Sequence, residues 1–153
     1  MKTENINSAE KLLKDSPSAA FLTAGNSMFP LLRTHKDIVT VEHVCHPLKK
    51  DDVPLYKSYG HKNLVLHRII DVTADGIYVT RGDNTYTKEY VNPDNVVGVM
   101  TSIYRNGKHI DCKTSVPYKI YVKVTKFFYP VRWLWKVQIR PFLGRVKRKI
   151  FHK

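Results

Sequence analysis

Short strand-like segments closed off by turn-forming residues are the feature that most constrains the fold of this 153-residue chain. The segments are rich in β-branched and aromatic residues and lie between clusters of Gly, Pro, Asn or Asp, a pattern typical of strands that reverse direction at turns. They cover residues 20–23, 38–43, 55–58, 64–71, 77–80 and 96–104. Asp75-Gly76 and Asn106-Gly107 predict hairpin turns, and Pro54 predicts an edge strand or the start of a strand. We therefore expect a mainly β fold, with a compact antiparallel, barrel-like sheet.

A short helix is predicted ahead of these strands, over residues 5–14, because apolar side chains recur there on one helical face. The same segment carries acidic residues and has no apolar core of about 7 to 15 residues, so it does not predict a secretory signal. No apolar run in the chain approaches the roughly 20 residues of a membrane-spanning helix. The sequence therefore predicts a cytoplasmic protein, either free or peripheral on a membrane.

Charge divides the chain into two parts. Residues 1–112 hold 14 of the 26 basic side chains and all 13 acidic ones, whereas residues 113–153 hold 12 basic side chains and no acid. We interpret residues 1–112 as a nearly neutral domain and residues 113–153 as a basic, helical tail that does not form a separate domain. The net charge of +13 therefore belongs almost entirely to the tail.

The tail alternates aromatic residues with lysine and arginine, and Pro130 and Pro141 predict its division into three short segments. An amphipathic segment with tryptophan and cations suits an anionic membrane surface, which we expect residues 117–153 to bind. Nucleic acid is a competing partner, because phosphates attract the same cations and aromatic rings stack on bases. Helices packed on the domain with a solvated basic face are the third interpretation.

Three motifs carry residues suited to hydrolytic chemistry. Ser27, within Gly25-Asn26-Ser27-Met28-Phe29-Pro30, is a candidate nucleophile if a base lies beside it, and backbone N–H groups of such a turn can form an oxyanion hole. His67, in an apolar strand, is a candidate general base, since the ordinary histidine pKa lies near 6.5. Asp83, within Gly82-Asp83-Asn84, could orient that base. Taken singly, each motif also fits a structural role: a loop, a core histidine and a turn.

In combination the motifs resemble the superfamily of signal peptidases and LexA-like serine peptidases. The similarity covers about residues 21–104 and keeps the order of the family's segments. These are Ser27-Met28-Phe29-Pro30, Asp37-Ile38-Val39-Thr40-Val41, Asp52-Val53-Pro54-Leu55-Tyr56, His67-Arg68-Ile69-Ile70, Gly82-Asp83-Asn84 and Val96-Val97-Gly98-Val99. Most bacterial members use lysine as the base, so His67 at that position resembles the endoplasmic-reticulum and sporulation type of signal peptidase.

This resemblance implies a serine endopeptidase with Ser27 as nucleophile, His67 as general base and Asp83 as the acid that orients His67. The histidine-type relatives also carry an essential acid six residues after the aspartate of the Gly-Asp-Asn motif, which makes Glu89 the alternative. Gly25, Met28 and Pro30 would shape the oxyanion and substrate positions, with backbone groups as donors. The resemblance further implies small side chains just before the cleaved bond.

We expect such an enzyme to remove a leader or signal segment from a specific precursor peptide or protein. One alternative is a self-cleaving LexA-like regulator, although the roughly 20 residues before the strands leave no room for a DNA-binding domain. Another is a non-catalytic peptide- or nucleic-acid-binding module on the same fold. No cofactor and no metal are expected. A zinc site would have to combine residues whose spacing fits no standard pattern, namely His43, Cys45, His46, His109 and Cys112.

Overall fold

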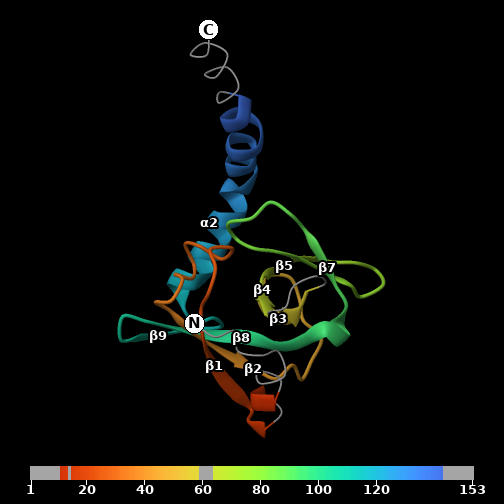
Figure 1. Ribbon diagram of the computed structural model, residues 1–153, viewed down its shortest axis with the longest axis vertical. Coiled ribbons are helices and arrows are strands. Elements are labelled where there is room, and N and C mark those ends of the chain that lie inside the picture. Colours follow the sequence, from red (N-terminus) through yellow and green to blue (C-terminus); the bar gives the residue numbers. More distant parts are fainter. Residues whose placement is uncertain (1–10, 14, 59–63, 143–153) are drawn as a thin grey trace. The chain divides into compact units, whose positions relative to one another are not determined.

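The computed structural model describes residues 11–13, 15–58 and 64–142 (Figure 1). These residues form two antiparallel β-sheets followed by a helical segment, which confirms the prediction of a mainly β fold. Of the helix predicted over residues 5–14, Lys11–Leu13 are helical and the remaining residues lie outside the described ranges.

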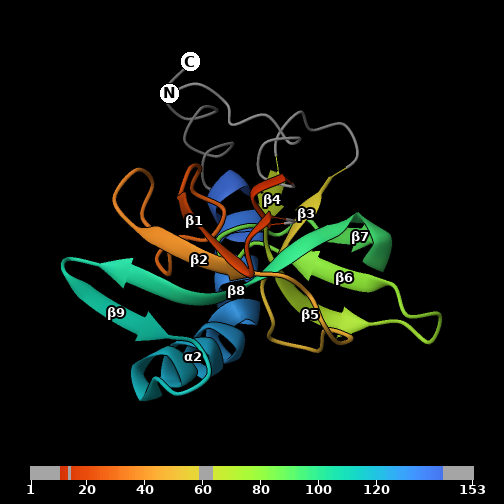
Figure 2. The ribbon, with the colours of Figure 1, turned by 90° about the horizontal axis from the view of Figure 1, so that it is seen from below.

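The larger sheet has six strands and is strongly curved (Figure 2). Five of its strands lie in the order β1 (Ser18–Leu22), β2 (Ile38–Glu42), β8 (Val96–Arg105), β3 (Pro54–Lys57) and β4 (Leu64–Leu66), and β9 (Lys108–Asp111) pairs with Ser102–Arg105 of β8. The smaller sheet has the order β5 (Arg68–Val72), β6 (Tyr78–Arg81) and β7 (Glu89–Val91). A 3₁₀ turn, η1 (Pro93–Asn95), leads into β8.

The single strand predicted over residues 64–71 is wrong, because the chain changes sheet at His67. The preceding residues form β4 and pair with β3, whereas the residues from Arg68 onward form β5 and pair with β6. One residue therefore carries the chain from the larger sheet to the smaller one. This crossing positions His67 between the sheets.

Both predicted hairpin turns are confirmed. β5 and β6 are joined through Asp75-Gly76, and β8 and β9 through Asn106-Gly107, where Arg105 pairs with Lys108. Asn106 and Gly107 have φ values of +50° and +76°, the left-handed conformation that a two-residue hairpin turn requires. Pro54 begins β3, as predicted for a strand start, whereas β7 and β9 are short strands that propensity did not single out.

A cluster of buried side chains joins the two sheets. Tyr56 comes from the larger sheet, and Ile69, Tyr78 and Val91 come from the three strands of the smaller one. Leu48, in the loop before β3, completes the cluster and donates its backbone N–H to the Tyr78 hydroxyl at 3.1 Å. The apolar packing therefore fixes the smaller sheet against the larger one beside the crossing residue.

The chain divides into two compact units, residues 1–118 and 119–153. Helix α2 (Val116–Trp133) begins in the first unit, and a six-residue π-helical segment, η2 (Leu134–Ile139), follows it. The predicted break at Pro130 is wrong, because α2 continues through this proline to Trp133. Proline removes one helical hydrogen bond, and the backbone leaves α geometry one turn later, in η2, instead of ending the helix. Within the described residues, no helix combines the length and the apolarity needed to span a bilayer.

Candidate active site

The turn that carries Ser27 lies in a loop closed by hydrogen bonds at its base. Thr23, just after β1, donates its backbone N–H and its hydroxyl to the carbonyl oxygen of Asp37, just before β2, at 3.0 and 2.9 Å. The backbone N–H of His35 donates to the Thr23 carbonyl at 2.8 Å, and the Thr34 hydroxyl donates to the Gly25 carbonyl. These bonds hold the Ser27 turn against the start of the larger sheet.

A buried carboxylate fixes the same loop from inside. Both oxygens of Asp37 accept from the Arg105 guanidinium, at 3.1 and 2.6 Å, and Arg33 donates to the same carboxylate at 2.8 Å. Burial alone would raise the pKa of Asp37, but the hydrogen bonds from Arg105 and Arg33 outweigh it and hold the pKa well below its usual range. Asp37 begins one of the segments on which the family resemblance rests. Through Arg105 it links the loop to the end of β8.

The backbone of Ser27 packs directly on the turn that follows β6. The Asn84 N–H donates to the Ser27 carbonyl at 2.7 Å, and the Asn84 amide donates to the Asn26 carbonyl at 3.1 Å. A Cβ atom at Gly82 would lie 2.6 Å from the Ser27 carbonyl oxygen and 3.0 Å from the Ser27 Cβ, so a glycine is required at this contact. The structure thus brings together two of the three sequence motifs.

The remaining motif, the apolar strand segment, contributes His67, whose side chain is buried between the sheets. Its Nδ1 lies 3.3 Å from Glu89 Oε1 and 3.1 Å from the Tyr56 hydroxyl. The Tyr56 hydroxyl donates its single proton to Glu89 Oε2 at 2.9 Å, so the His67 Nδ1 is the donor in its own contacts. This assignment puts the proton of the neutral ring on Nδ1 and its basic lone pair on Nε2.

Two further hydroxyls complete the group around Glu89. Ser58 donates to Glu89 Oε2 at 2.9 Å, and Thr80 lies 3.0 Å from the Tyr56 hydroxyl. Burial raises the pKa of Tyr56 far above its ordinary value, which keeps its proton available for the carboxylate. None of the sequence motifs indicated a site role for Tyr56, Ser58 or Thr80. A buried tyrosine hydroxyl needs a partner, but the sequence does not say which residue provides it.

The next residue, Arg68, forms a separate buried ion pair. Its Nε and Nη2 donate to the two oxygens of Asp83 at 2.9 and 2.8 Å, in the bidentate geometry typical of arginine and carboxylate. Its Nη1 donates to the Asp51 carbonyl and to the Tyr118 hydroxyl, both at 3.0 Å. Burial would lower the pKa of Arg68, but the hydrogen bonds and charge of Asp83 raise it above its ordinary value, so the guanidinium stays charged.

These contacts favour Glu89 over Asp83 as the acid that orients His67. Neighbouring residues of an extended chain point to opposite sides, so His67 and Arg68 meet different partners. Asp83 in the turn after β6 meets the arginine, and Glu89 at the start of β7 meets the histidine. The acid six residues after the aspartate is therefore the one that touches the candidate base.

The remaining candidate residues line the serine turn. Gly25 is exposed with φ +82°, Met28 is buried and accepts from the Leu32 N–H at 2.9 Å, and Pro30 is exposed after a cis peptide bond. Among the described residues, neither the hydroxyl nor the backbone N–H of Ser27 takes part in a hydrogen bond. In free enzymes the hydrogen bond from nucleophile to base is often long and tightens when substrate binds.

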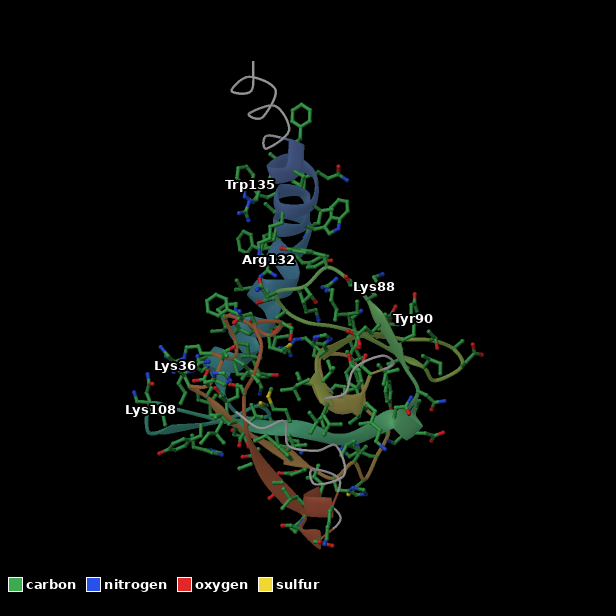
Figure 3. All side chains as sticks on the ribbon, viewed as in Figure 1. Lys36, Lys88, Tyr90, Lys108, Arg132 and Trp135 are labelled. Carbon is green, nitrogen blue, oxygen red and sulfur yellow. The ribbon has the colours of Figure 1, made fainter. Side chains whose placement is uncertain are left out.

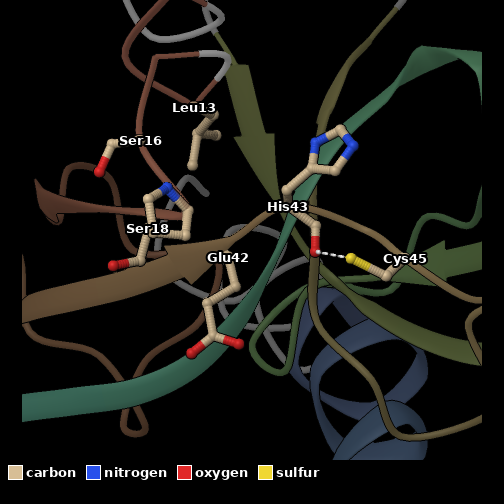
Figure 4. Close-up of a pocket in the computed structure, with 7 residues that line it drawn as sticks. Leu13, Ser16, Ser18, Glu42, His43 and Cys45 are labelled. Carbon is tan, nitrogen blue, oxygen red and sulfur yellow. Dashed lines mark hydrogen bonds between the residues drawn. The ribbon is translucent and has the colours of Figure 1, made fainter.

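A shallow surface pocket, separate from the candidate residues described above, lies beside β1 (Figure 4). Its lining residues are Leu13, Ser16, Pro17, Ser18, Glu42, His43 and Cys45. The Cys45 thiol lies 3.8 Å from the His43 carbonyl oxygen, which brings together two of the residues considered for zinc. In the part of the chain that the structure describes, no three His, Cys, Asp or Glu residues are grouped so as to hold a metal ion.

Comparison with known proteins found no matching family model, no similar curated protein and no similar solved structure.

Proposed function

We propose that this chain is a serine endopeptidase of the signal-peptidase-like class that removes a leader or signal segment from a precursor peptide. The observation that carries the proposal is the contact of His67 Nδ1 with Glu89 Oε1 at 3.3 Å, inside a network that directs the basic nitrogen away from the acid. A histidine held by an acid on one ring nitrogen is the arrangement that general-base catalysis uses.

In the proposed reaction, His67 Nε2 takes the proton of the Ser27 hydroxyl as Ser27 Oγ attacks the carbonyl carbon of the substrate peptide bond. The tetrahedral intermediate collapses when His67 returns that proton to the leaving amine, which leaves an acyl group on Ser27. Water, deprotonated by His67, then releases the acyl group and restores the serine. Glu89 positions the ring and stabilises its positive charge in both steps.

The Ser27 backbone N–H is the proposed oxyanion donor. Within the described residues this N–H makes no hydrogen bond, and its turn is held in place by the Thr34 hydrogen bond and by the Gly82 contact. A preorganised donor is worth more than a mobile one, because it needs no rearrangement as negative charge develops. Arg68 and Asp83 are positioning residues in this scheme, since their ion pair joins the residue after His67 to the turn that supports Ser27.

The test is cleavage of a peptide library, with the new termini identified by mass spectrometry, for wild type, Ser27→Ala and Ser16→Ala. Ser16 is an exposed serine outside the motif and serves as the matched control. We expect wild type and Ser16→Ala to produce the same new termini, preceded by small side chains, and Ser27→Ala to produce none. If Ser27→Ala cuts the library as wild type does, the proposal is wrong.

A further inference from the structure

Helix α2 and the segment after it carry a continuous stripe of exposed apolar side chains. The stripe consists of Val116, Ile120, Val124, Phe127, Phe128, Val131, Leu134 and Trp135, whose spacing of one, three or four residues follows one side of a helix. Every one of these side chains is exposed, with Phe127 at 76% and Val131 at 63%. Side chains project outward along this whole segment in Figure 3, where Trp135 and Arg132 are labelled. A soluble helix normally buries such a stripe, so its exposure here indicates a binding surface.

The charges beside the stripe identify that partner. Lys119, Lys123 and Lys126 follow the helix along one margin, and Arg132 and Lys136 lie beyond the other margin. Residues 113–153 contain no acidic side chain. We propose that residues 116–142 lie flat on an anionic lipid surface, with the apolar stripe in the acyl region and the flanking cations at the headgroups.

A second copy of the same helix fits less well. Helices that pair through an apolar stripe usually place opposite charges along its margins, so that the two chains attract each other. Here both margins are cationic, and pairing two such helices would bring like charges together. The margins therefore disfavour self-association and favour an anionic surface.

Nucleic acid accounts for the cations but not for the stripe. A phosphate backbone attracts lysine and arginine, and bases stack on aromatic rings, but neither removes Val116, Ile120, Val124, Val131 and Leu134 from water. An acyl layer buries all of them at once. This inference does not depend on the proposed peptidase activity, because it uses none of the candidate site residues.

The two tryptophans of the chain allow a direct test, because both lie in this segment. Trp135 belongs to the stripe, whereas Trp133 lies roughly 200° away around the helix axis, on the opposite side. In the full-length chain, Trp133→Phe leaves Trp135 as the only tryptophan, and Trp135→Phe leaves Trp133, so excitation selective for tryptophan reports on one position at a time. With vesicles of phosphatidylcholine and phosphatidylglycerol, we expect Trp135 emission to shift to shorter wavelength and to be quenched by brominated lipid, and Trp133 to change much less.

Matched substitutions separate the two contributions to binding in a vesicle sedimentation assay. Phe127→Ser with Val131→Ser is expected to weaken partitioning about tenfold or more, because it removes apolar surface from the stripe. Val72→Ser with Tyr104→Ser removes exposed apolar side chains from β5 and β8 and should leave partitioning unchanged. Lys119→Gln with Lys123→Gln should weaken binding about fivefold per lysine on the anionic vesicles alone.

Four results would overturn the inference: no partitioning, equal partitioning onto pure phosphatidylcholine, equal shifts for the two tryptophans, or a self-associated state that shields Trp135 from iodide before lipid is added. Binding to a DNA or RNA duplex without a shift of Trp135 would identify nucleic acid as the partner instead.

Discussion

The carboxylates of Asp83 and Glu89 contact two adjacent residues of the chain, Arg68 and His67, but their surroundings differ. Asp83 accepts hydrogen bonds from Nε and Nη2 of Arg68, and the side chains of Asp83 and Arg68 are only 5% and 3% exposed. Glu89 contacts His67 and two hydroxyls, and its side chain is 28% exposed. The Arg68–Asp83 pair is therefore buried, whereas the His67–Glu89 pair is partly exposed to solvent through Glu89.

The two carboxylates also differ in whether the side chain that they contact can exchange a proton. Arg68 stays charged, because the hydrogen bonds and the charge of Asp83 raise the pKa of its guanidinium. A histidine side chain can be neutral or positively charged, so it is able to accept a proton and return it. We therefore expect the first pair to contribute to stability and, under the proposed function, the second to transfer protons, and each variant below tests one of these expectations.

The largest expected effect is on stability, from Asp83→Asn. This change leaves the buried Arg68 without its counter-charge, and breaking a buried pair in this way costs about 3–5 kcal/mol. Urea unfolding measures the loss. Asp71→Asn removes the same charge from an exposed position of β5 and should change stability by less than about 0.5 kcal/mol. Equal effects of the two variants would contradict the structural role of Asp83.

The next largest effect is on catalysis, from Glu89→Gln. The amide keeps the size of the side chain but cannot stabilise a positive ring, so we expect kcat/KM to fall about 100-fold or more while stability changes by roughly 1 kcal/mol. Glu42→Gln, on β2, is the control. If Asp83→Asn leaves the fold intact and costs more activity than Glu89→Gln, the roles of the two acids are reversed.

The pH dependence should separate the two pairs in the unmodified protein. Lowering the pH from 8 to 5 protonates an imidazole base, so activity should fall with the pH and recover on return. The fold should persist, because the pKa of Asp37 is depressed by Arg105 and Arg33. Its contribution to stability is present above the unfolded value near 3.9 and is lost only as the pH falls below that. Circular dichroism and a pH–rate profile measure the two quantities, and a flat rate profile would contradict His67 as the base.

The smallest expected effect comes from Tyr56→Phe. The hydroxyl contacts His67, Thr80 and Glu89, but solvent and Ser58 still reach the carboxylate without it. We expect a loss of about 1–1.5 kcal/mol in stability and a severalfold decrease in kcat/KM. Tyr104→Phe, at an exposed position of β8, is the control for both measurements. A hundredfold decrease would show that Tyr56 acts on the proton itself.

Most of the strands could be predicted from the sequence, because β-branched runs between turn residues are a local signal. The crossing at His67 could not be predicted in this way. Nothing in residues 64–71 distinguishes one strand from two, and the break depends on β3 and β6, which pair with its two halves. The same holds for the missed β7, whose three residues are strand only because they pair with β6.

The candidate site was predictable in its residue types and not in all its contacts. The motifs indicated Ser27, His67 and two possible acids, and the structure brings the Ser27 turn onto the Gly82 turn. The choice between Asp83 and Glu89 required knowing that His67 and Arg68 face opposite sides of the crossing. In the tail, the helix-breaking tendency of Pro130 was overestimated, since one lost hydrogen bond does not end a helix of 18 residues.

The position of β8 sets the order in which this molecule can assemble during synthesis. Within the larger sheet, β1 and β2 carry the loop of Ser27, and β3 and β4 lead to His67, yet the two pairs of strands meet only through β8. β8 begins at residue 96, after both candidate catalytic residues have been made. A ribosome-bound chain that has not yet released β8 therefore lacks the strand that joins these two pairs within the larger sheet. If the chain is a peptidase, we expect it to become active only after β8 has been made.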